Sequence, residues 1–239
     1  MGQVLTLELE SNAAAVRQLL AEAVRRYGRV VYANSLGAEA MVLTDIICCA
    51  VPEVDVISID TGRLPEETHE LLERLQRRYR NRIRVVYPDA EALGSLVGRQ
   101  GTNGFFHSTE ARLACCHVRK VLPFQRLVAG YAAWVTGVRR EQSQARSLGA
   151  PLEWDAQHAL FKVSPLLEWT TDQVWSYIRA RGLPYNSLHD RGYPSIGCAP
   201  CTRAIQPGES SRAGRWWWEN PESRECGLHP RVQTAAAQS

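Results

Sequence analysis

The stretch Val30-Val-Tyr-Ala-Asn-Ser-Leu-Gly-Ala-Glu39 joins a short apolar run to a turn that contains a glycine, and a mostly apolar segment follows it to residue 50. The apolar run predicts a buried strand over residues 30–33, and the later segment predicts a helix over residues 39–50. Backbone N–H groups at the start of a helix bind phosphate or sulfate, and small residues let the anion come close. The turn is therefore a candidate anion site, although many strand-to-helix turns contain a glycine.

Strand and helix patterns alternate on both sides of this stretch. Helices are predicted over residues 12–27, 66–79, about 108–122 and 170–181, and strands over residues 54–59, 83–87, 134–136 and 160–163. Helices between strands imply crossover connections, so we predict an α/β fold with a largely parallel sheet covered by helices on both faces. Ligands of such sheets bind beyond the carboxyl ends of the strands, which here lead into the loops 35–37, 60–62 and 137–140.

The composition is that of an ordinary globular chain, with 45% hydrophobic and 22% charged residues among 239. It excludes collagen-like and wholly disordered classes. No apolar run approaches the roughly 18 residues that span a bilayer, and the N-terminus lacks the basic and apolar regions of a secretory signal. We therefore expect a cytoplasmic protein without a membrane partner. A net charge of +3 gives no argument for a nucleic-acid partner.

The periodic patterns fade near residue 183, after which Pro, Gly, Ser, Arg and Trp dominate. This change in character divides the chain into an α/β domain over residues 1–183 and a C-terminal segment over residues 184–239. We expect the C-terminal segment to be irregular and to serve function rather than the core.

Two pairs of arginines are candidate anion ligands, because guanidinium groups bind oxyanions with paired hydrogen bonds. Arg139 and Arg140 follow a predicted strand, and Arg212 and Arg215 lie in the C-terminal segment. Only two of the 28 basic residues are lysines, so any single arginine is weak evidence for a site. Lys120 is more informative, since a lysine in such a chain suggests a position where a compact ammonium group fits and a planar guanidinium does not.

Seven cysteines fall into four groups, and in a cytoplasmic chain they are more often metal ligands, nucleophiles or core residues than disulfides. Cys48 and Cys49 lie on an apolar helix face, where free cysteine behaves as a small hydrophobic residue. Cys115-Cys116 and Cys198-Ala-Pro-Cys201 together supply four sulfurs, enough for zinc or a [4Fe–4S] cluster. Adjacent cysteines are awkward ligands for tetrahedral zinc, so the pattern favours an iron–sulfur cluster, with a redox dithiol as the alternative.

Basic side chains accompany the paired cysteines. On a helix, Cys115 faces Arg119 and Cys116 faces Lys120, because residues four apart lie on the same face. Neighbouring cations stabilise the thiolate, which is the form that binds metals.

Cys226 stands apart from the other cysteines, in Arg224-Glu-Cys-Gly-Leu-His229 near the end of the chain. A thiol with an arginine and a histidine close in sequence is a candidate thiolate nucleophile. The alternative is a surface thiol without a role.

Taken together, these motifs resemble the assimilatory APS/PAPS reductase family, and within it the iron–sulfur adenylyl-sulfate (APS) reductases. The matching stretches occur in family order over about residues 30–230, namely residues 35–39, 60–68, 115–120, 136–143, 198–201 and 225–229. Paired cysteines, a CxxC and a C-terminal Glu-Cys-Gly-Leu-His rarely coincide by chance. The resemblance implies an adenine-nucleotide α-hydrolase-like fold, related to the PP-loop ATP pyrophosphatases, with residues 1–183 as the nucleotide-binding domain.

The resemblance also implies a reaction. Cys226 would attack the sulfur of adenosine 5′-phosphosulfate (APS), expel AMP and become an S-sulfocysteine, from which thioredoxin or a similar dithiol releases sulfite. Cys115, Cys116, Cys198 and Cys201 would bind a [4Fe–4S] cluster. The implied substrate contacts are Ser35, Gly37, Glu39, Lys120, Arg139, Arg140, Arg212, Arg215 and His229.

Other functions stay open at this point. A PAPS reductase or an enzyme of dual specificity is the nearest, although such relatives usually lack the cluster cysteines. A PP-loop tRNA thiolase would need a Ser-Gly-Gly-x-Asp-Ser loop, which residues 35–40 do not supply, and a non-catalytic metal-binding module is a further class. Ala40 replaces the second acid that many relatives carry after Glu39, which leaves the role of that acidic pair open. A homo-oligomer is likewise left open.

Overall fold

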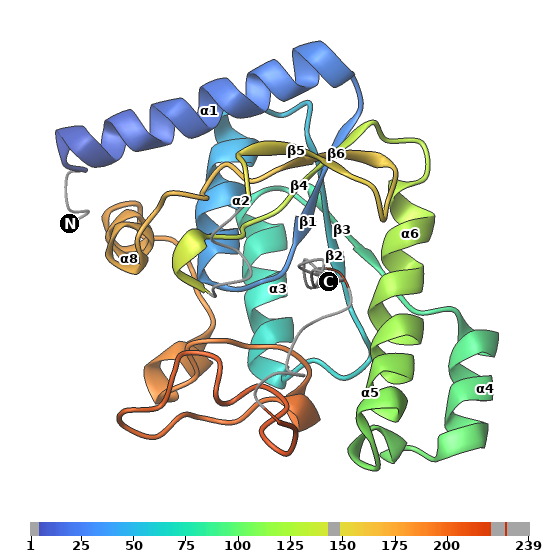
Figure 1. Ribbon diagram of the computed structural model, residues 1–239. Coiled ribbons are helices and arrows are strands. Elements are labelled where there is room, and N and C mark those ends of the chain that lie inside the picture. The colour runs from blue at the N-terminus through green and yellow to red at the C-terminus, as the bar shows by residue number, and fades with distance from the viewer. Residues whose placement is uncertain (1–4, 143–148, 221–227, 229–239) are drawn as a thin grey trace, which may run out of the picture.

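A six-stranded sheet forms the centre of the molecule (Figure 1). The computed structural model describes residues 5–142, 149–220 and 228. The strands follow the order β3-β2-β1-β4-β6-β5, and all neighbours are parallel except β5 and β6. Their bounds are β1 (Val30–Asn34), β2 (Asp55–Ile59), β3 (Ile83–Val86), β4 (Ala133–Val135), β5 (Leu152–Asp155) and β6 (Leu160–Val163). The predicted α/β fold is confirmed, and β5 is an antiparallel edge strand that the sequence patterns did not predict.

The α-helices of the described residues lie before, between and after these strands. They are α1 (Leu7–Tyr27), α2 (Ala38–Ala50), α3 (Glu66–Arg78), α4 (Ala90–Gln100), α5 (Thr109–Cys116), α6 (Leu122–Val128) and α8 (Thr171–Ala180). The predicted helix over residues 108–122 is α5, followed by a π-helical turn at His117–Val121 and then by α6. α1 begins earlier than predicted because the side chain of Thr6 caps the N–H of Leu9.

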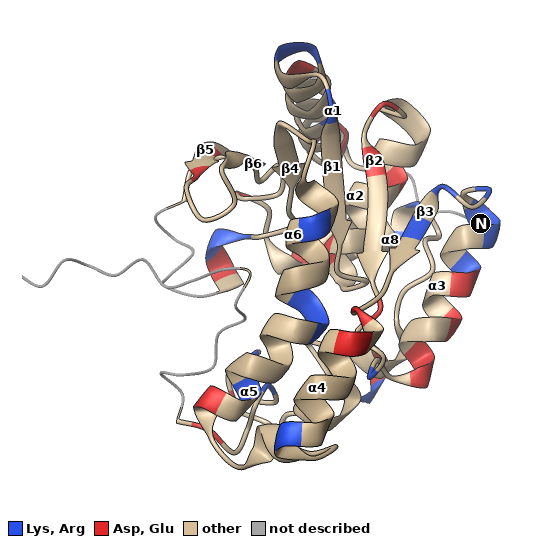
Figure 2. Cartoon of the chain, turned by 90° about the vertical axis from the view of Figure 1, so that its right-hand side faces the viewer, with Lys and Arg blue, Asp and Glu red and all other residues tan. Residues whose placement is uncertain are grey.

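Alternating side chains of β1 enter two separate cores, because successive residues of a strand point to opposite faces. Val30 and Tyr32 belong to the core formed with α1, α2, α3 and α8. Val31 belongs to the second core, beneath α6, with Phe124 and Trp134. Helices therefore cover both faces as predicted, and Figures 1 and 2 show α5 continuing from α6 beyond the sheet.

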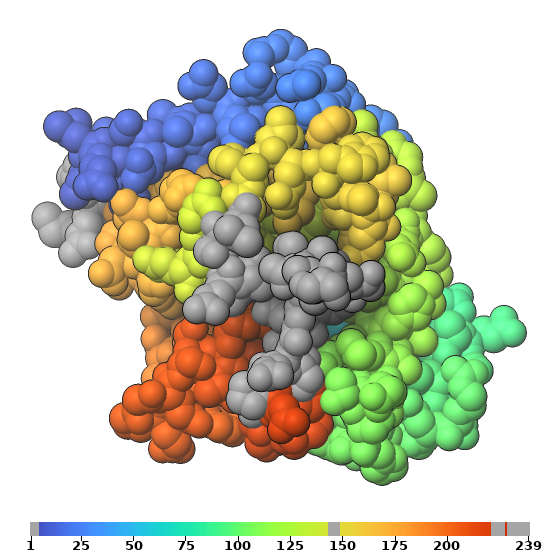
Figure 3. All heavy atoms as spheres, in the orientation of Figure 1, coloured from blue at the N-terminus to red at the C-terminus, as the bar shows by residue number. Residues whose placement is uncertain are grey.

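The C-terminal segment is irregular, as expected from its composition. Its described residues after Leu183 form no α-helix or extended strand, only 3₁₀ turns at Ser187–Arg191 and Ala199–Cys201 and an isolated bridge between Thr202 and Arg215. In Figure 3 the orange and red atoms of this segment lie beside the green atoms of α5. The domain boundary at residue 183 stays a prediction.

No helix among the described residues combines the length and the apolar character that a membrane crossing requires.

A buried carboxylate joins three helical elements on the first face of the sheet. Asp45 of α2 is 2% exposed and accepts hydrogen bonds from the hydroxyls of Tyr79 and Tyr177, both at 2.9 Å. The Nε of Arg181 donates to the same carboxylate at 3.2 Å. Burial, followed by the charge of Asp45, raises the pKa of both tyrosines, so their hydroxyls keep their protons and act as donors. Asp45 therefore links α2 to the ends of α3 and α8.

Replacing Asp45 with alanine is expected to lower the free energy of unfolding by about 3 kcal/mol, because buried hydroxyl donors lose their acceptor. Urea denaturation followed by circular dichroism measures this change. Glu53→Ala is the matched control, since Glu53 is exposed and its loss should change stability by less than about 0.5 kcal/mol. Equal midpoints for the two variants would show that the network contributes nothing.

Candidate active site

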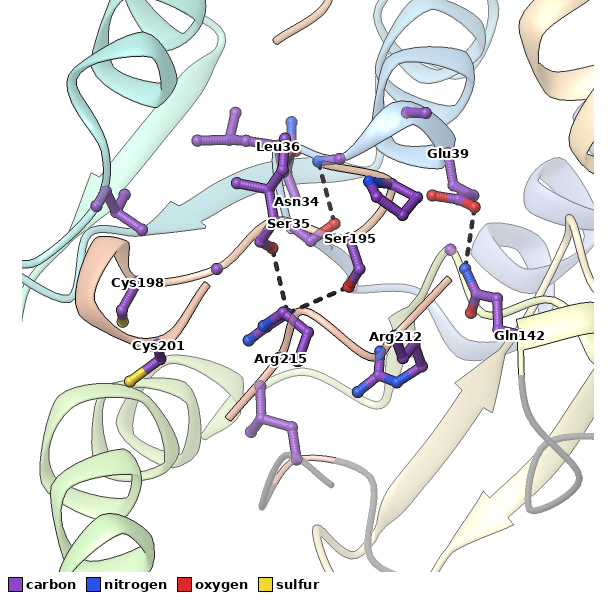
Figure 4. A pocket seen from close by; sticks show the side chains of 18 of the residues that line it. Asn34, Ser35, Leu36, Glu39, Gln142, Ser195, Cys198, Cys201, Arg212 and Arg215 are labelled. Carbon is purple, nitrogen blue, oxygen red and sulfur yellow. Dashed lines mark hydrogen bonds between the residues drawn. The ribbon is translucent and has the colours of Figure 1, made fainter. Parts of the chain in front are cut away.

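A cavity of about 850 Å³ lies where the carboxyl ends of β1, β2 and β4 meet α5, α8 and the C-terminal segment. Its lining includes residues from all three loops that the sequence singled out, at 35–39, at Thr61 and at 136–139. The four cysteines at positions 115, 116, 198 and 201 line it as well, together with Lys120, Arg212 and Arg215. Figure 4 shows the side chains of the labelled lining residues, which come from segments far apart in the sequence.

The loop after β1 is held in an unusual backbone conformation. Leu36 has a φ of 59°, a left-handed value that is uncommon for a non-glycine residue. The buried side chain of Asn34 fixes it: its Oδ1 accepts from the Leu36 N–H at 2.8 Å, while its Nδ2 donates to Thr44 at 2.9 Å. The loop then turns into the N-terminus of α2 at Gly37. The sequence analysis did not single out Asn34, although a short amide side chain directly after a strand is a known turn signal.

Glu39 is joined to the loop after β4 by Arg139. The Nε of Arg139 donates to Glu39 at 2.9 Å, and its other nitrogens donate to Glu141 at 2.7 Å, to the Trp169 carbonyl at 3.1 Å and to Thr171 at 3.1 Å. Arg139 is 5% exposed and lines the cavity. Its guanidinium thus fixes two loops of the cavity wall, while direct contact with a substrate stays a prediction.

Arg140 lies apart from the cavity lining. Its Nε donates to Glu168 at 2.7 Å in an exposed ion pair. Its predicted role as a substrate ligand gains no support from this position.

The structure brings the two cysteine pairs together around Phe105 and Trp216. Burial, together with charge repulsion from the other three thiols of the set, raises the pKa of Cys201 to about 12. Burial likewise raises the pKa of Cys115, and Cys198 adds to this effect. None of the six cysteines among the described residues forms a disulfide. Thiols this close and this buried become thiolates only where positive charge compensates them.

Polar neighbours supply part of that compensation. As the helical spacing predicted, Arg119 lies near Cys115, and its charge offsets part of the rise in the pKa of that thiol. Arg215 lowers the pKa of Cys201 through its charge. The Oγ1 of Thr61 lies 3.1 Å from the Sγ of Cys198. The π-helical turn after Cys116 leaves Arg119 buried, with its guanidinium donating to the Thr61 carbonyl at 2.7 Å.

The four cysteines supply the number and the kind of ligands that a four-thiolate cluster needs. Within residues 5–142, 149–220 and 228, no group of three or more His, Cys, Asp or Glu side chains is arranged to hold a metal ion. A [4Fe–4S] cluster is held by four cysteine thiolates. Four thiols that form no disulfide line one cavity wall and meet that requirement in number and in ligand chemistry.

Arg215 is held in a narrow slot beside the cysteines. Its guanidinium lies 4.6 Å from the ring centroid of Trp216 and donates to Ser195 at 3.4 Å. A Cβ at Gly197 would overlap the guanidinium, so only glycine gives it room there. In Figure 4 the side chain of Ser35 points toward Arg215 from the opposite wall. The predicted anion loop and the predicted C-terminal arginine therefore face each other.

Two predicted site residues, Cys226 and His229, lie outside the described residues. Leu228, between them in sequence, is described: it is 6% exposed, lines the cavity and packs in the core beneath α6 with Ile57 and Trp134. The C-terminal tail therefore reaches the cavity at Leu228.

Glu219 is a residue of this region that the sequence analysis missed. Its buried carboxylate pairs with Arg112 of α5, the helix that carries Cys115 and Cys116. The spacing of four residues between Arg112 and Cys116 could have indicated from the sequence that this arginine lies beside the cysteine pair. No local signal identifies its distant partner.

Comparison with known proteins agrees with this architecture. Residues 29–204 match the family described as the phosphoadenosine phosphosulfate reductase domain. The chain is 52% identical to the adenosine 5′-phosphosulfate reductase of Allochromatium vinosum, over 93% of this chain and 87% of that protein. It is 46% identical to the enzyme of the same name from Burkholderia cepacia, over 94% and 90% of the two chains.

Solved structures give the same result for the fold. The phosphoadenylyl-sulfate reductase of Candida auris superposes with a TM-score of 0.68 at 25% identity, covering 86% of this chain and all of that one. The FMN adenylyltransferase of Candida glabrata superposes with a TM-score of 0.59 at 15% identity, over 95% and 80% of the two chains, and so shares the fold alone. These neighbours confirm the expected PP-loop-like α/β architecture. On its sequence match and its fold, the chain belongs to the phosphoadenosine phosphosulfate reductase domain family.

Proposed function

We propose that this chain reduces adenosine 5′-phosphosulfate to sulfite and AMP, as an enzyme of sulfate assimilation. Relatives that match most of the chain carry the name of that activity. The observation that carries the proposal is a single cavity that joins an anion-binding loop, basic side chains and four cysteines. A phosphosulfate is an anion that needs such a lining, and the cysteine set is the feature that favours APS over its 3′-phosphorylated form.

Cys226 is proposed as the nucleophile. Its thiolate attacks the sulfuryl sulfur, so that an S–S bond forms while the bond from sulfur to the phosphate oxygen breaks and AMP leaves with the electron pair. Leu228 supports this role: Cα atoms two residues apart are separated by at most about 7 Å, and Leu228 lines the cavity. Cys226 is thus two residues along the chain from a side chain of the cavity wall, which is what the proposed attack needs.

An external dithiol completes the reduction. One of its thiolates attacks the Sγ of the S-sulfocysteine and displaces sulfite, and its second thiol then resolves the mixed disulfide and frees Cys226. The dithiol thereby supplies both electrons and ends as a disulfide. Thioredoxin has this chemistry, and a cytoplasmic setting, which keeps thiols reduced, suits both the free cysteines and the reductant.

The basic lining has the task of screening negative charge, because a thiolate must approach an anion. Lys120, Arg212 and Arg215 are proposed to bind the phosphate and sulfate oxygens, with His229 from the tail. The loop of Ser35 and Gly37 leads into the N-terminus of α2, whose first backbone N–H groups add donors. Such preorganised donors also stabilise the leaving AMP.

Cys115, Cys116, Cys198 and Cys201 are proposed to hold a [4Fe–4S] cluster. When bound, the cluster would supply a fixed local charge at the cavity wall, and no electron need pass through it because the external dithiol, acting through Cys226, supplies both electrons. Arg119 and Arg215 offset part of the rise in pKa that burial causes at Cys115 and Cys201.

Replacing Cys226 with serine should abolish both the adduct and sulfite release. Under anaerobic conditions without a reductant, wild-type protein incubated with APS should carry a sulfonate on the tryptic peptide of residues 225–231, found by mass spectrometry. Cys49→Ser, at an exposed thiol outside the cavity lining, should keep the adduct.

The same incubation with PAPS, the 3′-phosphorylated form of APS, shows which of the two nucleotides the protein accepts as substrate. An adduct from APS alone supports the proposal, and adducts from both would mean dual specificity. Sulfite release by Cys226→Ser would disprove the assignment of the nucleophile.

Replacing Cys198 with alanine should remove iron and most of the activity, because a four-thiolate site loses one ligand. Iron and acid-labile sulfide per chain measure the first effect, and sulfite release measures the second. Cys49→Ala is the matched control and should retain both. Full iron content in Cys198→Ala would mean that the ligand set is wrong.

Replacing Gly197 with alanine should raise the KM for APS about tenfold, because the new Cβ displaces Arg215 from its slot and a hydrogen bond to a charged group is worth about 1.5 kcal/mol or more. Gly98→Ala is the control, since a Cβ there meets no atom within 4 Å. Steady-state kinetics at saturating reductant distinguish the two. An unchanged KM in Gly197→Ala would exclude Arg215 as a substrate ligand.

A further inference from the structure

A buried ion pair connects the helix of the first cysteine pair to the C-terminal segment. The Nε of Arg112 donates to one carboxylate oxygen of Glu219 at 2.9 Å, and a terminal guanidinium nitrogen donates to the other at 2.8 Å. The two side chains are 1% and 3% exposed. Bidentate arginine–carboxylate contacts fix both distance and orientation, so the pair sets how the segment sits on α5.

Both partners of the ion pair are also in contact with the cysteine site. Arg112 hydrogen-bonds the thiol of Cys116, one helical turn away. On the other side, the N–H of Glu219 donates to the carbonyl of Trp216 at 2.9 Å, and the N–H of Trp216 donates to the carbonyl of Cys201 at 3.1 Å. The pair therefore connects one cysteine of each group through a short series of direct contacts.

Glu219 also balances the positive charge of the two arginines that lie against the Trp216 ring. The guanidinium carbons of Arg112 and Arg215 lie 4.7 and 4.6 Å from the centroid of the Trp216 ring. Two cations on one indole ring repel each other in a buried setting. The carboxylate of Glu219 neutralises one of them, which allows both arginines to stay beside the cysteines.

Stability alone does not account for the presence of this pair. Removing two charged groups from water costs about as much as their attraction returns, and apolar residues of similar volume often stabilise a fold equally well. A buried pair that touches a proposed metal ligand is better explained by the position it imposes, as with the outer partners of metal ligands in general.

We propose that Glu219 is a positioning residue for the four-cysteine site. By binding Arg112 it holds that guanidinium against Cys116 and holds Trp216 against Cys201, and so fixes the separation of the two cysteine pairs. This inference rests on the proposed cluster ligands.

The test compares Glu219→Gln with Glu209→Gln. Glu209 also binds an arginine through both carboxylate oxygens, with two contacts of 2.7 Å to Arg203 in the same segment. Arg203 does not belong to the cluster around the cysteines. Iron loss to an excess of chelator is followed anaerobically by visible absorption. Glu219→Gln is expected to lose iron about tenfold faster than wild type, in line with the loss of an outer partner of a metal ligand, and Glu209→Gln at the wild-type rate. A wild-type rate and spectrum in Glu219→Gln would overturn the proposal.

A double variant separates positioning from folding. Arg112→Met combined with Glu219→Leu replaces the pair by apolar groups of similar volume, so the melting temperature of the apoprotein should stay near that of wild type. We expect iron loss to remain fast in this variant. If it retains iron as wild type does, the pair serves packing only and the proposal fails.

One outcome would affect the proposed function instead. If the wild-type chain binds no iron on anaerobic reconstitution, the cluster assignment fails, and positioning is then read from the reaction of Cys201 with iodoacetamide. Cys201 is 8% exposed, so alkylation of its peptide should be several-fold faster in Glu219→Gln than in Glu209→Gln, as local opening exposes a buried thiol. Equal rates would overturn the positioning role.

Discussion

The site depends on holding an irregular segment in register with a helix. Two of the four grouped cysteines lie on α5, whose backbone fixes them, but the other two lie in a segment whose described residues form no α-helix or extended strand. Individual contacts therefore replace a backbone ladder there. The Trp216 N–H on the Cys201 carbonyl, the Arg112–Glu219 pair and the space left by Gly197 are the main ones. The relative placement of the thiols is thus a property of side-chain packing around Trp216.

Two of the arginines around the cavity donate their hydrogen bonds to other groups of the protein. Arg139 is committed to Glu39 and Glu141, and Arg119 donates to a backbone carbonyl. Because these guanidinium groups already have acceptors, they organise the wall more than they attract a ligand. A count of arginines therefore overstates the capacity of this cavity for anions, and a lysine in an arginine-rich chain is the more specific sign of a ligand contact.

Sequence reasoning succeeded where the information is local. The β1 strand, the turn at Ser35 and α2 follow from one short stretch, and parallel topology then brings the three post-strand loops to one edge. It missed the π-helical turn at His117–Val121, because the same residues suit an ordinary helix and tertiary packing decides between them. It also missed Glu219, whose partner Arg112 is distant in sequence. A contact between residues so far apart in the chain produces no pattern in the sequence from which it could be predicted.

The proposed chemistry requires one sulfur atom to meet two partners in turn, first the nucleotide and then the dithiol. A thiol fixed in the core could not do both, and a strongly docked tail would hinder the second encounter. The described anchor of the tail is the Leu228 side chain, whose burial stabilises the docked state by about 2 kcal/mol. That energy corresponds to a factor of about thirty in population at 25 °C. An anchor of this strength favours the bound position of the Leu228 side chain while leaving its released state accessible.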